Sequence, residues 1–208
     1  MIEPEPTSAA DVFGDRLPLA RAFTAALAEH GEERGLIGPL ELPRLWSRHI
    51  LNSAIIAPLF TAGAEVGDVG SGAGLPGLVL AIARPDVSWV LIEPMERRVA
   101  WLNEQVSALG LDNVRVVRSR AEDYRPLASL DQVTARAVSA LRTLIPIVAP
   151  LVRPGGELIL LKGAGAPQEM DAAVKQIRRF NLHDVRVEVV GEQVLPEPSR
   201  VVRATLAE

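Results

Sequence analysis

The chain has 208 residues, of which 48% are hydrophobic and 23% charged, and its formal net charge is -4. This composition is typical of a globular protein with one sizeable core, and the acidic balance argues against a protein that coats nucleic acid through many phosphate contacts. Because the sequence contains no cysteine, it excludes disulfides, thiolate metal sites and a cysteine nucleophile. No apolar run is long enough for a membrane span, and the acidic start MIEPEPTSAAD differs from a signal peptide, so we expect a cytoplasmic protein without membrane contact.

Residues 1–62 are predicted to form a helical extension. Thr7 or Ser8 is placed to cap a first helix through AADVF, and LARAFTAALAEHGEE continues with helical spacing after Pro18. A second helical stretch, ELPRLWSRHILNSAIIAPLF, places its apolar residues near one face and ends at Pro58. Two tryptophans, Trp46 here and Trp101 further on, lie in apolar helical patterns and are expected in the core.

Residues 63–208 show short apolar runs that alternate with helical segments, the pattern of a mostly parallel sheet with crossover helices. The expected strands are 65–69, 88–93, 114–118, 131–135, 157–162, 185–190 and 200–206. The expected helices are 75–84, 95–109, 139–152 and 167–180. The last two strands are joined by GEQVLPEPS, which is too short for a crossover helix, so we expect an α/β sheet that ends antiparallel. The extension and the sheet domain are expected to form one structural unit.

A glycine-rich stretch, GDVGSGAGLPG, follows the first expected strand and precedes a helix. It combines D-x-G-x-G-x-G with G-x-G-x-x-G at Asp68, Gly70, Gly72, Gly74 and Gly77. Glu93 closes the next strand, 21 residues after Gly72. Glycines let the backbone approach a ligand, and a carboxylate at the second strand end can accept both ribose hydroxyls. The pattern therefore predicts a nucleoside cofactor, either a dinucleotide or S-adenosylmethionine.

Three features favour S-adenosylmethionine. In dinucleotide enzymes the first strand usually opens the domain, whereas here a helical extension precedes it. Pro76 stiffens the first helical turn, where a pyrophosphate needs free backbone amides. Asp68 lies near the first glycine, where an acidic residue in methyltransferases can reach the amine of the methionine part. In SRAEDY, after the third strand, Glu122 or Asp123 is placed to contact adenine, although an acidic pair can equally cap a turn. An NAD-dependent oxidoreductase remains an alternative, but with Tyr124 as the only tyrosine a Ser-Tyr-Lys group is hard to build. A protein that binds S-adenosylmethionine without catalysis also remains open.

The methyl acceptor is narrowed by exclusion. Methylation of pyrimidine carbon 5 commonly needs a cysteine, exocyclic amines commonly need Pro-Pro after the fourth strand, and ribose methylation needs a lysine-centred set; the chain supplies none of these. Methylation of guanine N7 requires only that this nitrogen is aligned with the methyl group, because N7 has a lone pair and no proton to lose. Arg136, after the fourth strand, is a candidate for a cofactor or RNA contact, and the alternative is an ion pair with Asp131 or Glu122.

Six motifs resemble, in this order, the small-subunit ribosomal RNA methyltransferase G family, also called glucose-inhibited division protein B. They are RHILNS (48–53), DVGSGAGLPG (68–77), SRAED (119–123), ARAV (135–138), LLKG (160–163) and SRVV (199–202). The resemblance covers roughly residues 40–205. It implies a class I methyltransferase that modifies guanine N7 in the decoding region of small-subunit ribosomal RNA. It also implies cofactor contacts at Gly70, Leu75, Ala121, Glu122 and Arg136, to which the strand position adds Glu93.

Further expectations concern the RNA. The candidate RNA contacts are Arg48, Arg136, Lys162 and Arg200. For Arg48 and His49 the alternative is to hold the extension on the core, and for Lys162 and Arg200 it is a solvated surface charge. Two positions depart from the family pattern: Asn52 stands where RHILDS has Asp, and SRVV lacks the Glu-Arg-His form of many relatives. These departures put the RNA contacts, rather than methyl transfer, in question. We expect a monomer that acts on the ribosomal subunit or an assembly intermediate, without DNA; another RNA or a small molecule is the alternative acceptor.

Overall fold

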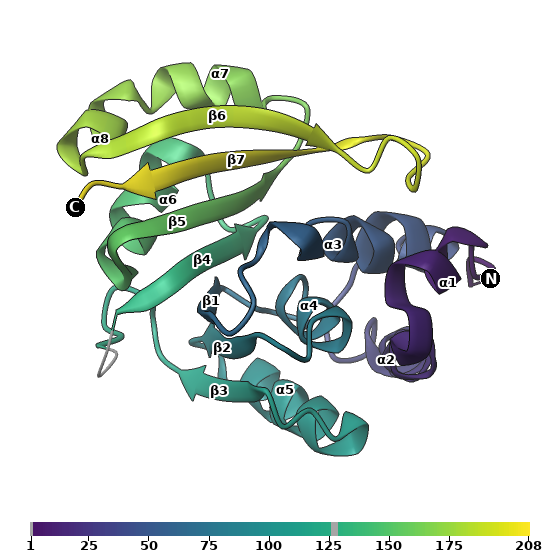
Figure 1. Ribbon diagram of the computed structural model, residues 1–208. Helices are drawn as coiled ribbons and strands as arrows, with labels where there is room; N and C mark the ends of the chain where they lie inside the picture. The colour runs from purple at the N-terminus through teal and green to yellow at the C-terminus, as the bar shows by residue number, and fades with distance from the viewer. Residues whose placement is uncertain (1, 126–128) are drawn as a thin grey trace.

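The computed structural model describes residues 2–125 and 129–208, and its centre is a seven-stranded sheet (Figure 1). From edge to edge the strands are β3 (Val114–Arg118), β2 (Ser88–Glu93), β1 (Glu65–Val69), β4 (Leu130–Arg136), β5 (Val152–Lys162), β7 (Ser199–Leu206) and β6 (Leu182–Val190). The pairs from β3 to β5 are parallel, while β7 runs antiparallel to both β5 and β6. The prediction of a mostly parallel sheet with an antiparallel end is confirmed.

Both faces of the sheet are buried, which explains why its central strands are almost continuously apolar. Side chains alternate along a strand, so in β2 Trp89 and Leu91 enter one core while Val90 and Ile92 enter the other. Helices α4 (Gly77–Ala83) and α5 (Glu96–Leu109) cover the first face. Helices α6 (Leu141–Val148), α7 (Ala166–Ala172) and α8 (Val174–Arg179) lie on the second.

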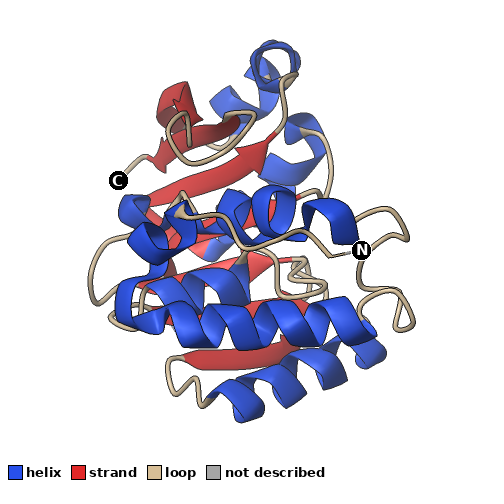
Figure 2. Cartoon of the chain, turned by 90° about the vertical axis from the view of Figure 1, so that its right-hand side faces the viewer, coloured by secondary structure: helices blue, strands red, loops and turns tan. Residues whose placement is uncertain are grey.

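The N-terminal extension forms an outer layer over the first face, in front of the strands in Figure 2. Its helices are α1 (Ser8–Phe13), α2 (Leu17–His30), a π-helix η3 (Leu45–Leu51) and the single turn α3 (Asn52–Ala54). Helix α2 contacts both α4 and α5. Because Phe23, Leu27 and Leu45 are fully buried in the same core as the sheet residues, the extension and the sheet share one hydrophobic interior.

Several predicted bounds needed correction. The stretch expected as one helix up to Pro58 is broken into short 3-10 turns at Leu42–Arg44 and Ala57–Leu59, with the π-helix and α3 between them. A proline lies in each 3-10 turn, and its ring and missing N–H interrupt regular helical bonding. Thr7 precedes α1, but its side chain makes no capping bond.

Nearer the C-terminus, the helix predicted over 139–152 ends at Val148, because Val152 already pairs with Leu130 as the start of β5. The helix predicted over 167–180 is divided into α7 and α8. No helix in the described part of the chain combines the length and apolar character needed to cross a membrane.

Candidate functional site

The glycine loop connects β1 to α4 at the carboxyl edge of the sheet. Gly70, Gly72 and Gly74 have φ values of 74°, 56° and 95°, in the left-handed region that side chains rarely adopt. Gly77 meets a different requirement, because a Cβ at this position would collide with Leu91 and with the Asp68 carboxylate. The glycines therefore shape the loop and bring α4 against the strands.

Asp68 lies beneath this loop and is completely buried. Its Oδ2 accepts a hydrogen bond from the Gly77 N–H at 3.0 Å, while Oδ1 has no partner among the described residues. Burial raises the pKa of Asp68 to about 7, against the opposing effects of the Ser71 hydroxyl and the Gly77 N–H. An unpaired buried carboxylate oxygen is costly, so a cationic or hydrogen-bond-donating ligand group that reached it would be bound favourably.

Glu93 ends β2 and fixes the other side of the loop, with only 2% of its surface exposed. Its Oε2 accepts from the Gly72 N–H at 3.0 Å and its Oε1 from the Met95 N–H at 2.9 Å; the Arg98 guanidinium is 4.0 Å away. These bonds hold a carboxylate at the mouth of the glycine loop. Each carboxylate oxygen can accept a second hydrogen bond, so ribose hydroxyls remain possible partners.

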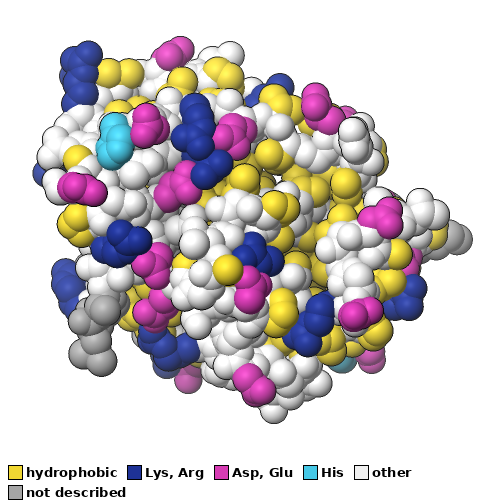
Figure 3. Space-filling model, viewed as in Figure 1, with side chains coloured by type: hydrophobic (Ala, Val, Ile, Leu, Met, Phe, Trp, Pro, Cys, Tyr) yellow, Lys and Arg dark blue, Asp and Glu magenta, His cyan; other side chains and the backbone are white. Residues whose placement is uncertain are grey.

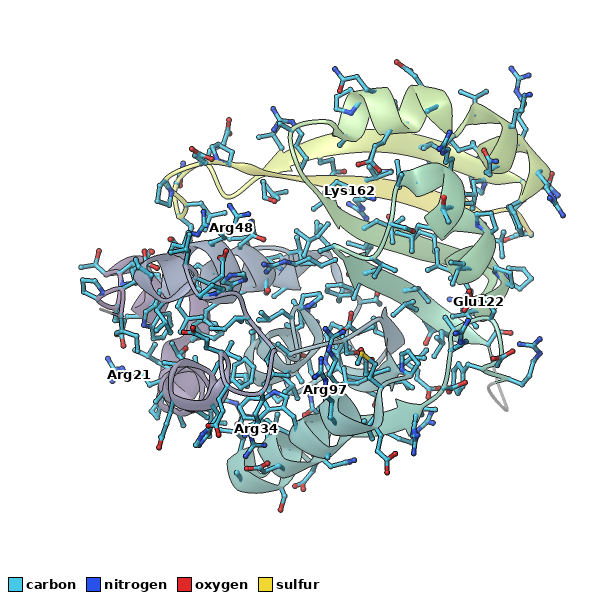
Figure 4. The ribbon with its side chains drawn as sticks, turned by 180° about the vertical axis from the view of Figure 1, so that it is seen from behind. Arg21, Arg34, Arg48, Arg97, Glu122 and Lys162 are labelled. Atoms are coloured by element: carbon cyan, nitrogen blue, oxygen red, sulfur yellow. The ribbon has the colours of Figure 1, made fainter. Side chains whose placement is uncertain are left out.

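The segment after β3 reaches the same edge of the sheet, since the Ser119 N–H donates to the Glu93 carbonyl at 3.3 Å. Ala121 is buried in the second core, whereas the Glu122 side chain is exposed at the far side of the sheet from Arg48 (Figure 4). Leu75, in the glycine loop, is half-buried against the first core. The predicted cofactor positions between Asp68 and Leu75 and at Glu93 thus lie around the ends of β1 and β2, and the segment with Ala121 and Glu122 begins beside them at the end of β3.

Arg136 ends β4, but its side chain turns toward the extension. It donates to the Ser53 Oγ at 3.0 Å, to the His49 carbonyl at 3.2 Å and to the His49 Nδ1 at 2.7 Å. The alternative of an ion pair with Asp131 or Glu122 is wrong. Asp131 lies at the opposite end of β4, where it pairs with Arg153 at 2.7 Å. Burial lowers the pKa of Arg136 to about 10, which leaves it charged at neutral pH.

His49 links Arg136 to the start of the second helical stretch. Because a guanidinium only donates, Nδ1 of His49 accepts, and its Nε2–H therefore donates to Glu41 at 2.7 Å. Burial, and then the Arg136 charge, lower the pKa of His49, which favours this neutral form. His49 thus holds the extension on the core. Arg48 remains 58% exposed, with its Nε 3.5 Å from a Glu41 oxygen.

A groove of about 760 Å³ lies between the extension, the end of β5 and the start of β7. Its cationic lining residues are Arg44, Arg48, Arg136, Lys162 and Arg200. Arg48 comes from the extension and Lys162 from the sheet, and both lie on this side of the molecule (Figure 4). The structure thus brings all four predicted RNA contacts to one surface, with Glu169 and Glu197 as the carboxylates of its lining.

Lys162 corrects one expectation, because it is not a solvated surface charge. Its side chain is only 9% exposed, its Nζ donates to the Ser139 carbonyl at 2.5 Å, and Glu169 Oε2 is 2.9 Å away. Sequence reasoning missed Glu169, which lies in no motif. The predicted core tryptophans are confirmed as buried, and the Trp101 indole N–H donates to the Ala73 carbonyl at 3.0 Å.

A second cavity, of about 550 Å³, lies where the extension meets the loop between β6 and β7. Figure 3 shows hydrophobic side chains gathered in a hollow on this side of the molecule. The lining of this second cavity includes Val12, Ile55 and Val194, and it contains none of the predicted site residues. The candidate site therefore has two parts: the carboxyl edge of the sheet at Asp68, the glycine loop and Glu93, which we call the cofactor edge, and the cationic groove.

Comparisons with known proteins agree with this geometry. The family model described as rRNA small subunit methyltransferase G matches residues 16–197. The ribosomal RNA small subunit methyltransferase G of Leifsonia xyli subsp. xyli is 69% identical over 99% of this chain and 98% of that protein. The protein of the same name from Corynebacterium glutamicum is 46% identical over 95% of this chain and 90% of that protein.

Solved structures show the same fold at low sequence identity. A tRNA (m1A58) methyltransferase from Aquifex aeolicus aligns with a TM-score of 0.60 and 14% identity over 76% of this chain and 68% of that chain. The N-methyltransferase NodS from Bradyrhizobium japonicum, solved with S-adenosyl-L-homocysteine, aligns with a TM-score of 0.58 and 14% identity over 87% of this chain and 99% of that chain. The fold is that of S-adenosylmethionine-dependent methyltransferases.

Proposed function

The chain belongs to the rRNA small subunit methyltransferase G family, and from this premise we propose that it methylates N7 of a guanine in the decoding region of small-subunit ribosomal RNA. It is an S-adenosylmethionine-dependent methyltransferase, and ribosomal RNA is its substrate.

The cofactor edge fits S-adenosylmethionine on two observations. The unpaired Oδ1 of Asp68 offers a buried acceptor to the methionine amine, and Glu93 presents a fixed carboxylate to ribose hydroxyls. The positive φ values of Gly70 and Gly72 favour glycine, and because glycine has no Cβ, no side chain from these positions enters this space. When bound, the cofactor supplies a methyl group on a sulfonium. The protein's task at this edge is to hold that group toward the groove.

The acceptor chemistry asks little of the protein beyond position. N7 of guanine has a lone pair and no proton to lose, so no general base is required. Arg136 is charged and donates all its hydrogen bonds to the extension, so it serves as a fixed boundary between the two halves of the site. The observation that carries the proposal is this adjacency: β4, which pairs with the cofactor-binding β1, ends in a residue that lines the cationic groove.

We also propose that the substrate is the ribosomal subunit or an assembly intermediate rather than free RNA. The protein has a net charge of -4, so sequence-independent attraction to phosphates is weak outside the groove. Such a surface needs RNA whose shape presents several phosphates at fixed positions. The proposal includes a monomer in the cytoplasm, in which residues 1–62 and 63–208 act as one unit because they share a core.

The test incubates the protein and isotope-labelled S-adenosylmethionine with small ribosomal subunits from a strain that lacks this gene. The RNA is then digested, and labelled nucleosides are identified by mass spectrometry. We expect labelled 7-methylguanosine from subunits and much less from naked RNA. Mapping the labelled fragment tests its position in the decoding region.

The control is the variant Glu93→Ala, which removes the proposed ribose contact and is expected to abolish labelling at limiting cofactor. If wild-type protein binds S-adenosylmethionine but labels no guanosine in either RNA, the proposed acceptor is wrong. Equal labelling of naked RNA would refute the proposed need for an assembled substrate.

A further inference from the structure

The segment Ala137–Ala140, between β4 and α6, lies between the glycine loop and the groove. Ala137 has a φ of 55°, a conformation that is strained for a residue with a side chain and persists only where its surroundings enforce it. Val138 lies so close to Gly70 that a Cβ added there would come within 2.9 Å of the Val138 Cγ2. We call residues 137–140 the acceptor segment. They extend from Ala137, which lines the groove expected to hold the methyl acceptor, to Val138, which lies against the glycine loop at Gly70.

Two side chains from other elements hold the far end of the acceptor segment. Lys162, the last residue of β5, donates from Nζ to the Ser139 carbonyl at 2.5 Å. Glu169, in α7, accepts the Leu141 N–H at 2.9 Å on the same Oε2 that lies 2.9 Å from the Lys162 Nζ. The Leu141 N–H belongs to the first turn of α6, where no helical carbonyl is available to it. One lysine–glutamate pair thus fixes both the segment and the helix that follows.

We propose that Lys162 and Glu169 are positioning residues for methyl transfer, which hold the acceptor segment against the glycine loop and do not contact RNA. This inference rests on the proposed function, since it assigns a role within the same site.

The alternative role of Lys162, a phosphate contact, fits the structure poorly. Its side chain is 9% exposed and its charge is already matched by Glu169, whereas Arg48 is 58% exposed. Removing Glu169 from this pair would leave a largely buried ammonium without its counter-charge. Burial raises the pKa of Glu169, but the bonds from Lys162 and the Leu141 N–H outweigh it and leave the pKa below its ordinary value. Glu169 therefore remains ionised at neutral pH.

The test measures kcat and KM for methylation of small subunits with Lys162→Met, Glu169→Gln and the double variant. The matched control is Lys175→Met, which removes the chain's other lysine, an exposed residue of α8. A misplaced acceptor segment is expected to lower kcat by about 10- to 100-fold in each single variant. The KM for subunits and the Kd for S-adenosylmethionine, measured by calorimetry, should stay within about threefold of wild type, because binding and positioning are separate terms. The double variant should lose little more than either single variant, since the two residues act as one pair.

Lys162→Arg separates the two roles without removing the charge. A phosphate contact accepts an arginine, so an RNA-binding role predicts nearly unchanged kcat and KM. A site shaped around a largely buried ammonium does not fit the larger guanidinium, so the positioning role predicts a lower kcat with an unchanged KM. If Lys162→Met does not fold because the charge is lost, Lys162→Arg, which keeps the charge, still distinguishes the positioning role from the RNA-binding role.

Two results would overturn the inference: single variants with wild-type kcat, or variants whose loss appears in KM and whose salt dependence falls. Failure of the proposed function is a separate result, in which the wild-type protein itself labels no guanosine in the subunits.

Discussion

Replacing Asp68 with asparagine is expected to stabilise the free protein while weakening its affinity for S-adenosylmethionine. Asp68 is fully buried and its Oδ1 has no partner among the described residues, so its ionised form is destabilised in the folded protein. Burial raises the pKa of Asp68 from 3.8 to about 7. Asparagine has the same shape and can accept the Gly77 N–H, but it carries no charge.

The sign of the pH effect follows from linkage. Because the folded pKa exceeds the unfolded one, Asp68 imposes no penalty on folding below about pH 4, and the penalty grows until the pH passes the folded pKa. At pH 8.5 the penalty is somewhat above about 4 kcal/mol, and at pH 5 it is somewhat below about 2 kcal/mol. The stability difference between Asp68→Asn and wild type should therefore shrink by about 3 kcal/mol from pH 8.5 to pH 5.

The assay is urea unfolding of both proteins at the two pH values, with calorimetry of S-adenosylmethionine binding at pH 8.5. Taking the difference between the proteins removes the titration of all other groups and any constant cost of the new amide. The control is Asp131→Asn: the Arg153 hydrogen bond holds the pKa of Asp131 below its ordinary value, so this variant should be destabilised equally at both pH values. A difference for Asp68→Asn that does not change with pH would refute the argument, as would unchanged cofactor affinity.

Three other outcomes are expected. Gly77→Ala should lower the free energy of unfolding by about 1 to 3 kcal/mol in urea titrations, because its Cβ would collide with Leu91; wild-type stability would show that α4 can shift away from the strand. Glu93→Gln should raise the Kd for S-adenosylmethionine at least about tenfold by calorimetry, since it loses a charge-assisted acceptor, and an unchanged Kd would remove Glu93 from the cofactor site. Arg48→Ser and Arg200→Ser should each weaken subunit binding and reduce its salt slope by about 1 in titrations at several ionic strengths; an unaltered slope would mean that the residue does not contact phosphate.

The cofactor edge was predictable because its signals are local in sequence. The glycines indicate backbone conformations that residues with side chains rarely adopt. The strand β2 was predicted at its observed bounds, Ser88–Glu93, because a strand buried on both faces is almost continuously apolar. The position after the fourth strand and the family resemblance both made Arg136 a candidate site residue, but neither predicted the direction of its side chain. That direction depends on His49 and Ser53, which lie more than 80 residues away in sequence.

The remaining part of the site depends on tertiary pairs that leave no pattern in the sequence. Glu169 lies only seven residues after Lys162, yet the two meet because a turn returns the chain from β5 to α7. A lone lysine at a strand end is commonly solvated, and only the fold shows that this one is paired. The broken helix before Pro58 has a similar cause, since the apolar spacing is helical while the prolines forbid continuous bonding.

The position of β7 has a consequence for the order in which the enzyme matures during synthesis. This strand, Ser199–Leu206, is synthesised after the other strands of the sheet, yet it lies between β5 and β6 and places Arg200 opposite Lys162. Domains generally fold as their residues emerge, so the cofactor edge can form while the groove still lacks a wall. A nascent chain therefore completes the groove only after β7 has emerged, later than it can form the edge of the sheet at β1 and β2.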